Sequence, residues 1–205
     1  MTASFDGAVL AGGASRRMGR DKALVPAPDG RALVVVALDA LRGAGAADVV
    51  VVGGDGVRLG ALGVSWVPDR YPGEGPLGGI LTALAATTAE LVVVVACDMP
   101  GVGPAVPTAL AGSLAAAAES GVAVAVVGGR EQPLTACWRR SIALGPLQRA
   151  FDEGVRAPRH VLPALRAVRV EGLPFSQLVD VDSPDDLRRY ADRHPGPDQE
   201  EEDTH

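Results

Sequence analysis

The segment VLAGGASRRMGRDKAL, residues 9–24, joins an apolar run to a glycine pair and then to a group of cations. Gly12 and Gly13 allow the backbone to turn sharply and to approach a bound group closely. Arg16 and Lys22 follow, in a chain with a formal net charge of −6, and Lys22 is its only lysine. Backbone N–H groups in such a turn can bind phosphate oxygens, while Arg and Lys neutralise their charge. The segment therefore predicts a phosphate site, and a solvated basic loop is the alternative.

Two known phosphate-binding motifs do not fit this segment. A P-loop has four residues between its glycines and then Lys-Ser/Thr. Here five residues separate Gly13 from Gly19, and Lys22 precedes Ala23. The Gly-x-Gly-x-x-Gly fingerprint of dinucleotide-binding folds is absent from these residues. The segment is thus expected to bind phosphate in another way.

A second glycine-rich segment, PDRYPGEGPLGGILTAL, follows the third predicted strand. It contains a formal Gly-x-Gly-x-x-Gly at Gly73, Gly75 and Gly78, with Asp98 twenty residues after the last glycine. An NAD-binding unit is therefore one alternative. Against it, five residues separate the strand from Gly73, and Pro76 lacks an N–H where the motif uses backbone donors. We favour a glycine loop at a helix N-terminus, against which a planar base can lie.

Carboxylates follow two further apolar runs. In VVVVACDMP, Asp98 comes just after the strongest buried strand, where it can reach the crevice beyond the sheet and hold a cation. Magnesium usually takes one or two carboxylates, with waters and substrate phosphates. A turn or helix-cap role for Asp98 is the alternative. In LVDVDSPDDL, Asp182 also follows a run, but Ser183 and Pro184 form a strong helix start. Whether Asp182 helps to hold a metal ion stays open.

Short apolar runs alternate with helical patterns along the chain. We expect strands at residues 7–11, 48–52, 64–67, 91–96, 122–127, 134–138, 168–170 and 178–181, and helices at residues 32–42, 79–87, 105–119, 142–151, 161–165 and 184–193. Uninterrupted Val, Leu and Ala runs are typical of strands buried on both faces, and their alternation with helices implies right-handed βαβ crossovers. The sequence therefore predicts an α/β fold: a single three-layer domain over residues 1–193, with a mostly parallel sheet and a mixed, partly antiparallel part in its second half.

Composition limits the remaining classes. A net charge of −6 and a pI near 5.0 argue against non-specific nucleic-acid binding. We expect no signal peptide and no membrane span, because no apolar run approaches the roughly 20 residues that cross a bilayer, and hence a cytoplasmic protein. Cys97 and Cys137 fit neither a disulfide framework nor a zinc motif and are expected to be small buried side chains. Residues 194–205, rich in Pro and Gly and then acidic, are expected to be a disordered tail.

The segments LAGGASRRMGRDKAL, DRYPGEGPLGGI, CDMP and DVDSPDDL occur in the order and spacing of the molybdenum cofactor guanylyltransferases. The chain resembles this family, part of a nucleotidyltransferase group with a Rossmann-like sheet, from about Gly7 to Tyr190. The resemblance implies transfer of GMP from GTP to the terminal phosphate of molybdopterin, with Mg²⁺ as cofactor and release of pyrophosphate. It also implies GTP and molybdopterin as partners, and makes a molybdoenzyme or a cofactor-insertion protein a candidate transient partner.

The resemblance also assigns roles to matching positions. It implies Arg16, Lys22 and Asp98 as catalytic residues, Asp98 as the metal ligand, and a nucleotide site formed by Leu10, Ala11, Gly12, Gly13, Lys22, Asp69, Gly78 and Asp98. Within that site, Arg16 and Lys22 contact the triphosphate and Asp69 the nucleoside. Gly12 and the segment 75–79 favour guanine, because cytidylyl relatives differ there.

The acceptor side matches the family only loosely. Arg156, Arg159 and His160 are candidates for the molybdopterin phosphate, with a surface basic patch as the alternative. Two other functions also stay open. One is a nucleotidyltransferase of the same fold that uses CTP or another acceptor, such as a sugar phosphate. The other is a nucleotide-binding protein without catalysis, which the set of Arg16, Lys22 and Asp98 disfavours.

Overall fold

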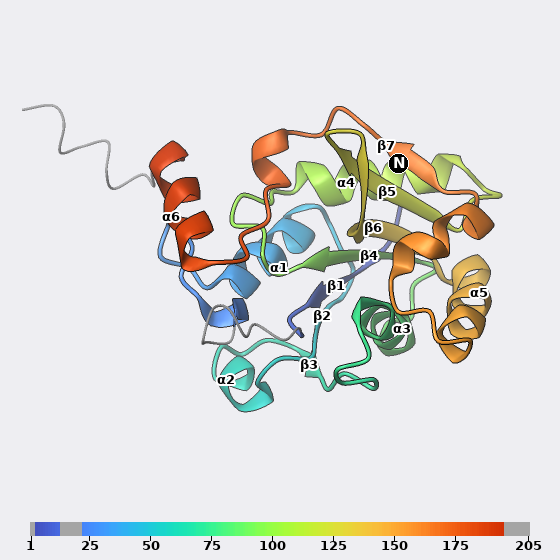
Figure 1. The fold of residues 1–205 in the computed structure, drawn as a ribbon, viewed down its shortest axis with the longest axis horizontal. Helices are drawn as coiled ribbons and strands as arrows, with labels where there is room; N and C mark the ends of the chain where they lie inside the picture. Colours follow the sequence, from blue (N-terminus) through green and yellow to red (C-terminus); the bar gives the residue numbers. More distant parts are fainter. Residues whose placement is uncertain (1–2, 13–21, 195–205) are drawn as a thin grey trace, which may run out of the picture.

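The computed structural model describes residues 3–12 and 22–194, and within them seven strands form one sheet (Figure 1). The strands are β1 (Asp6–Leu10), β2 (Val49–Val52), β3 (Trp66–Val67), β4 (Leu91–Ala96), β5 (Val122–Val127), β6 (Arg130–Arg139) and β7 (Val168–Val170). Their order in the sheet is β3-β2-β1-β4-β6-β5-β7. Every pair is parallel except those of β6, which runs antiparallel to both β4 and β5. The predicted fold class is therefore confirmed.

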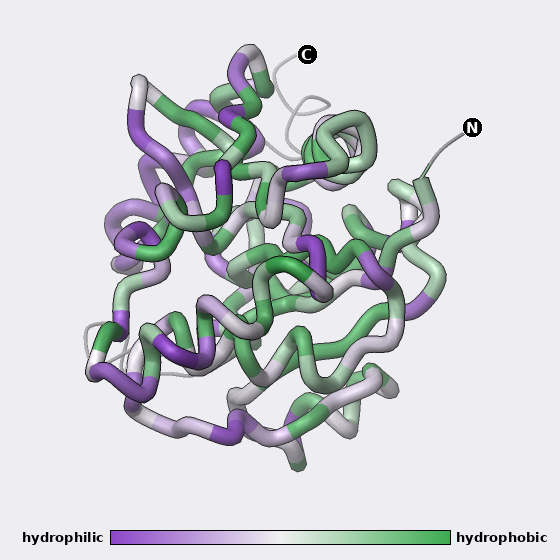
Figure 2. Tube along the Cα trace, turned by 90° about the vertical axis from the view of Figure 1, so that its right-hand side faces the viewer, coloured by the Kyte–Doolittle hydropathy of each residue, from purple (hydrophilic) through white to green (hydrophobic). Residues whose placement is uncertain are grey.

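Helices cover both faces of the sheet. They are α1 (Leu33–Gly43), α2 (Gly56–Gly60), α3 (Pro76–Ala86), α4 (Ala105–Ala116), α5 (Arg140–Asp152) and α6 (Pro184–Arg193), with 3-10 turns η1 (Lys22–Leu24), η2 (Pro158–His160), η3 (Leu162–Leu165) and η4 (Phe175–Gln177). Alternate residues of each strand face opposite layers. Val93 packs into the core under α1 and α4, and its neighbour Val94 into the core under α3 and α5. Figure 2 shows the predominantly hydrophobic strands at the centre of the molecule.

The antiparallel part is tighter than expected. The polar residues 130–133, predicted to be a loop, belong to β6, so only Gly128 and Gly129 connect it to β5. Both glycines have positive φ, 54° and 79°. Positive φ at both positions gives a two-residue turn whose twist matches the strands it joins, and glycine adopts it without strain.

Other boundaries also differ from the predictions. The predicted strand at 178–181 is wrong: its Val181 N–H donates to the Asp98 carbonyl, but the segment is not part of the sheet. The helix predicted from Gly79 begins at Pro76, since proline suits the first turn of a helix. The helix predicted at 161–165 is the 3-10 turn η3, and α2 was not predicted.

The two cysteines are buried, as predicted. Burial raises the pKa of the Cys137 thiol to about 12, which suits an inert packing residue. Among the helices of the described ranges, none has the length and apolar character needed to span a bilayer. Residues 195–205, most of the expected tail, lie outside the described residues.

Candidate active site

The carboxyl ends of β1, β2 and β4 meet at one edge of the sheet. Backbone bonds continue the pairing past the strands: the Ala11 N–H donates to the Val52 carbonyl (2.9 Å), and the Cys97 N–H to the Leu10 carbonyl (3.2 Å). These bonds bring the Leu10–Gly12 segment beside the residue after Cys97, Asp98. Leu10 and Ala11 are buried and Gly12 is exposed, so the backbone emerges from the core at Gly12. Gly13 and Arg16, which the resemblance places in the nucleotide site, lie outside the described residues.

Lys22 joins two carboxylates at this edge. Its Nζ donates to Asp98 Oδ2 at 2.9 Å and to Asp182 Oδ1 at 2.8 Å. Asp98 follows β4, whereas Asp182 precedes α6. The Val181 N–H donates to the Asp98 carbonyl (2.9 Å), and Ser183 caps α6 by accepting from the Asp186 N–H (3.2 Å). The backbone on both sides of Asp182 is therefore held, and its carboxylate faces the same cation as Asp98.

The cluster carries one positive and two negative charges. Burial lowers the pKa of Lys22. The charges of Asp98 and Asp182, and the hydrogen bond that Lys22 makes to each of them, outweigh burial and hold that pKa above its ordinary value. Burial raises the pKa of Asp98, which the charge and hydrogen bond of Lys22 oppose only in part, and Asp180 and Asp182 raise it further. The burial of Asp98 thus outweighs the attraction of Lys22, and a cation close to this carboxylate favours its ionised form.

Asp69 lies across the strand ends from this cluster. Its Oδ1 accepts from the Tyr71 N–H and from the Thr82 hydroxyl of α3, each at 3.0 Å. A methyl group added at Gly12 would lie 4.0 Å from Asp69 Oδ2 and 3.8 Å from the Gly53 Cα. A methyl group would thus fit at Gly12 in ordinary van der Waals contact, and it would occupy space beside the Asp69 carboxylate that glycine leaves open.

Two residues near Gly12 and Asp69, namely Gly53 and Trp66, were not predicted from the sequence to belong to the site. Gly53, with φ +76°, follows β2 and packs its backbone against Gly12. Trp66 donates from Nε1 to the Gly53 carbonyl at 2.7 Å and so fixes that turn. The signal was the glycine pair of VVGGDG directly after an apolar run, the same pattern that marks the first segment.

Gly78 has a packing role in the structure. A Cβ at this first-turn position of α3 would approach the Tyr71 Cβ to 2.7 Å, which real Cβ atoms do not tolerate. The glycine therefore lets Tyr71 lie on α3. Its predicted contact with the nucleotide stays a prediction.

Thr82 anchors Asp69 and offers a direct test. We expect Thr82→Val to lower the free energy of unfolding by about 1–3 kcal/mol, because Asp69 and the Arg70 N–H both lose a partner. We also expect weaker nucleotide binding, because the Asp69 carboxylate becomes free to turn. Chemical denaturation and nucleotide titration measure the two effects. Thr82→Ser keeps the hydroxyl and should retain most of both, so an equal loss in the serine variant would contradict the anchoring role.

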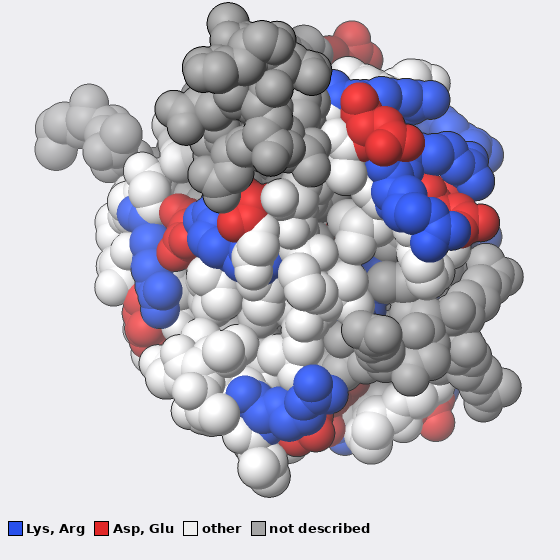
Figure 3. All heavy atoms as spheres, turned by 90° about the vertical axis from the view of Figure 1, so that its left-hand side faces the viewer, with Lys and Arg blue, Asp and Glu red and all other residues white. Residues whose placement is uncertain are grey.

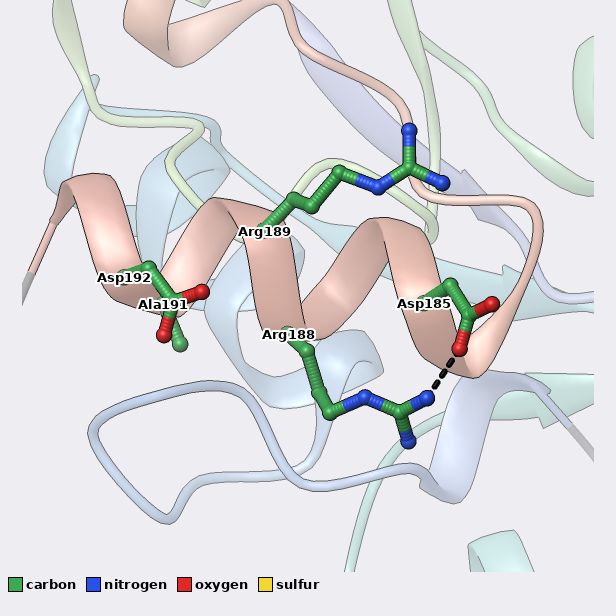
Figure 4. Close-up of a pocket in the computed structure, with 5 residues that line it drawn as sticks. All are labelled: Asp185, Arg188, Arg189, Ala191 and Asp192. Atoms are coloured by element: carbon green, nitrogen blue, oxygen red, sulfur yellow. Dashed lines mark hydrogen bonds and ion pairs between the residues drawn. The ribbon is translucent and has the colours of Figure 1, made fainter.

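Two cavities lie along α6, on the face shown in Figure 3, where clusters of opposite charge border an uncharged stretch. One, of about 390 Å³, is lined entirely by α6 residues and is crossed by an ion pair between Arg188 and Asp185 (Figure 4). The other, of about 480 Å³, separates α6 from residues 25–28. Neither is lined by Lys22, Asp98 or Asp69. The predicted site residues Lys22, Asp98 and Asp69 therefore lie at the strand ends, outside both cavities.

Comparisons with known proteins show the family to which the chain belongs. The model of the MobA-like NTP transferase domain matches residues 7–169. A protein of Opitutus terrae named probable molybdenum cofactor guanylyltransferase is 37% identical over 92% of this chain and 95% of its own. The chain therefore belongs to the MobA-like molybdenum cofactor guanylyltransferase family. A relative of the same name in Pelotomaculum thermopropionicum is 35% identical over 91% of this chain and 82% of its own.

Solved structures place the fold in the same group. Molybdopterin-guanine dinucleotide biosynthesis protein A of Archaeoglobus fulgidus is 27% identical, with a TM-score of 0.75 over 92% of this chain and 97% of its own. The 2-C-methyl-D-erythritol 4-phosphate cytidylyltransferase of Thermus thermophilus, 21% identical, shares the fold with a TM-score of 0.67 over 94% of this chain and 98% of its own. Membership of the MobA-like family replaces the dinucleotide-binding interpretation of Gly73, Gly75 and Gly78.

Proposed function

We propose that this chain transfers GMP from GTP to the terminal phosphate of molybdopterin and releases pyrophosphate, in a magnesium-dependent reaction. The observation that carries the proposal is the cluster of Lys22 with Asp98 and Asp182 beside the Leu10–Gly12 segment, in a chain whose relatives bear the name molybdenum cofactor guanylyltransferase. Because GTP is a cytoplasmic nucleotide, a cytoplasmic location belongs to the same proposal.

The two carboxylates fit a magnesium ion. Asp98 Oδ2 and Asp182 Oδ1 lie 2.9 and 2.8 Å from the Lys22 nitrogen, so both oxygens face one cation. A magnesium ion held by both carboxylates would take the place of this ammonium, and Lys22 would then be free to contact phosphate. Hard oxygen donors, one or two carboxylates at a time, are the ligands that Mg²⁺ prefers. Magnesium held by one or two carboxylates completes its coordination with waters and substrate phosphates. Bound there, Mg²⁺ would neutralise charge on the phosphates.

The remaining chemistry requires positioning and charge neutralisation. A phosphate oxygen of the acceptor attacks the α-phosphorus of GTP, a new P–O bond forms, and the bond to pyrophosphate breaks in line with it. Such a transfer needs positive charge beside the negatively charged transferred and leaving groups more than it needs a protein nucleophile. The Lys22 ammonium would supply that charge. The Leu10–Gly12 backbone would line the triphosphate, and the fixed Asp69 carboxylate would accept from donor groups of the nucleoside.

Pyrophosphate release is the direct test. Purified protein with Mg²⁺ and molybdenum-loaded molybdopterin would be given GTP, CTP, ATP and UTP in parallel. We expect release with GTP alone. Release with CTP would overturn the guanine assignment of Gly12 and residues 75–79. No release with any nucleotide, despite GTP binding, would overturn the acceptor and favour another one, such as a sugar phosphate.

A further inference from the structure

Arg156, a candidate acceptor ligand, has a half-exposed side chain that makes several contacts within the chain. Its Nε donates to Glu74 Oε2 at 2.8 Å, and its Nη1 donates to the carbonyls of Phe151 (2.7 Å) and Val155 (3.2 Å). The guanidinium carbon also lies 4.2 Å from the centre of the Phe151 ring. Phe151 belongs to the last turn of α5, where carbonyls lack helical partners and a cation is favourable. These contacts use Nε and Nη1, so that among the guanidinium nitrogens Nη2 alone is left for a phosphate ligand within the described residues.

The backbone of Arg156 holds the start of α3. Its carbonyl accepts from the Leu77 N–H at 3.1 Å, one of the first-turn donors that a helix leaves unpaired. Gly75, the N-cap of α3, has a φ of +86°, and a Cβ there would lie 3.1 Å from the Arg156 Cβ. The glycine loop and the backbone at Arg156 therefore pack directly against each other.

The contacts continue from Arg156 to the nucleoside side of the site. The Phe151 ring packs against the Tyr71 ring, with centroids 4.5 Å apart at 51°. The Tyr71 N–H donates to Asp69 Oδ1, and Tyr71 lies on Gly78 of α3. A continuous series of contacts thus runs from the guanidinium through two aromatic rings to the Asp69 carboxylate.

We infer that Arg156 is a positioning residue for the nucleotide: it holds the segment 71–77, and through it Asp69, in the place where the nucleoside binds. Its Nε and Nη1 serve this role rather than binding the acceptor phosphate. The identity of the nucleotide rests on the proposed function, but the direction of the effect does not. Arg159, exposed in the neighbouring η2, remains available for the acceptor.

The test separates nucleotide binding from acceptor binding. The Kd of a non-hydrolysable GTP analogue is measured without acceptor, and the acceptor KM and kcat are measured by pyrophosphate release. For Arg156→Met we expect the nucleotide Kd to rise about tenfold, as when one or two such bonds are lost, with the acceptor KM unchanged. Arg156→Lys should recover little, since an ammonium neither stacks on Phe151 nor spans Glu74 and the Phe151 carbonyl. Arg159→Met is the matched control, with no effect on the nucleotide Kd.

The opposite pattern would overturn the inference. A raised acceptor KM with an unchanged nucleotide Kd in Arg156→Met, restored by Arg156→Lys, would make Arg156 a charge for the acceptor phosphate. If Arg156→Met lacks a cooperative melting transition, Glu74→Gln decides, because it removes one contact of the guanidinium and should raise the nucleotide Kd a few-fold. If the wild-type chain binds another nucleotide than GTP, the proposed function fails, but the same variants report on Arg156 with that nucleotide.

Discussion

Replacing Lys22 by alanine is expected to lower kcat about a hundredfold or more while the chain stays folded, as when one preorganised charge is removed from a transition state. The Lys22 ammonium lies between the two carboxylates of the candidate site, and its side chain is only 12% exposed. Turnover is measured by pyrophosphate release, and folding by thermal melting. The variant leaves Asp98 and Asp182 facing each other without a cation. Its Tm should therefore fall, and added Mg²⁺ should raise it more than in the wild-type protein.

Lys22→Arg is the matched control for charge alone. Arginine keeps the positive charge, but its planar guanidinium needs more room than an ammonium on a flexible stem. The lysine nitrogen lies within 2.9 Å of two carboxylate oxygens, so the space around it is narrow. We expect the arginine variant to recover only part of the turnover. Wild-type rates in that variant would show that charge alone is required, and would contradict this explanation for the only lysine of the chain.

The sheet could be predicted because most of its strands coincide with short apolar runs in the local sequence. The run LVVVVA became β4 with the predicted bounds, since a short, valine-rich run without polar interruptions is typical of a strand buried on both faces. The segment 178–181 carries a similar but shorter pattern, LVDV. It failed because the position beside Asp98 offers one backbone hydrogen bond and no neighbouring strand, a fact of the tertiary structure that the segment itself does not encode.

In the candidate site, too, the residues marked by local sequence could be predicted, whereas contacts that depend on the tertiary structure could not. Asp98 and Lys22 stand in local contexts, a strand end and a glycine turn, that mark them directly. The pairing of Asp182 with Lys22 spans 160 residues and depends on how α6 docks, so the sequence could name Asp182 but not its contact. Arg156 shows the converse. Its charge suggested a phosphate ligand, whereas its Nε and Nη1 donate to Glu74 and to carbonyls that only the folded chain brings near.

Asp98→Asn is expected to produce the second large loss, a fall in kcat of about a hundredfold together with a higher Mg²⁺ concentration for half-maximal rate, as for a removed charge at a transition-state site. Asp98 is the less exposed carboxylate of the pair, 24% against 61% for Asp182, so its charge acts in the environment of lower dielectric. Pyrophosphate release over a range of Mg²⁺ concentrations measures both effects.

The stability of Asp98→Asn separates this loss from unfolding. Because burial raises the pKa of Asp98, the fold disfavours its ionised form, and a neutral amide of the same shape removes that cost. We therefore expect a Tm close to that of the wild-type protein even though Lys22 loses one partner. Asp182→Asn should reduce kcat only about tenfold. Asp182 is more exposed to water, and its carboxylate therefore attracts a cation less strongly. An equal loss in the two variants would mean that the carboxylates share the cation evenly. An unchanged Mg²⁺ dependence in Asp98→Asn would remove Asp98 from the metal site altogether.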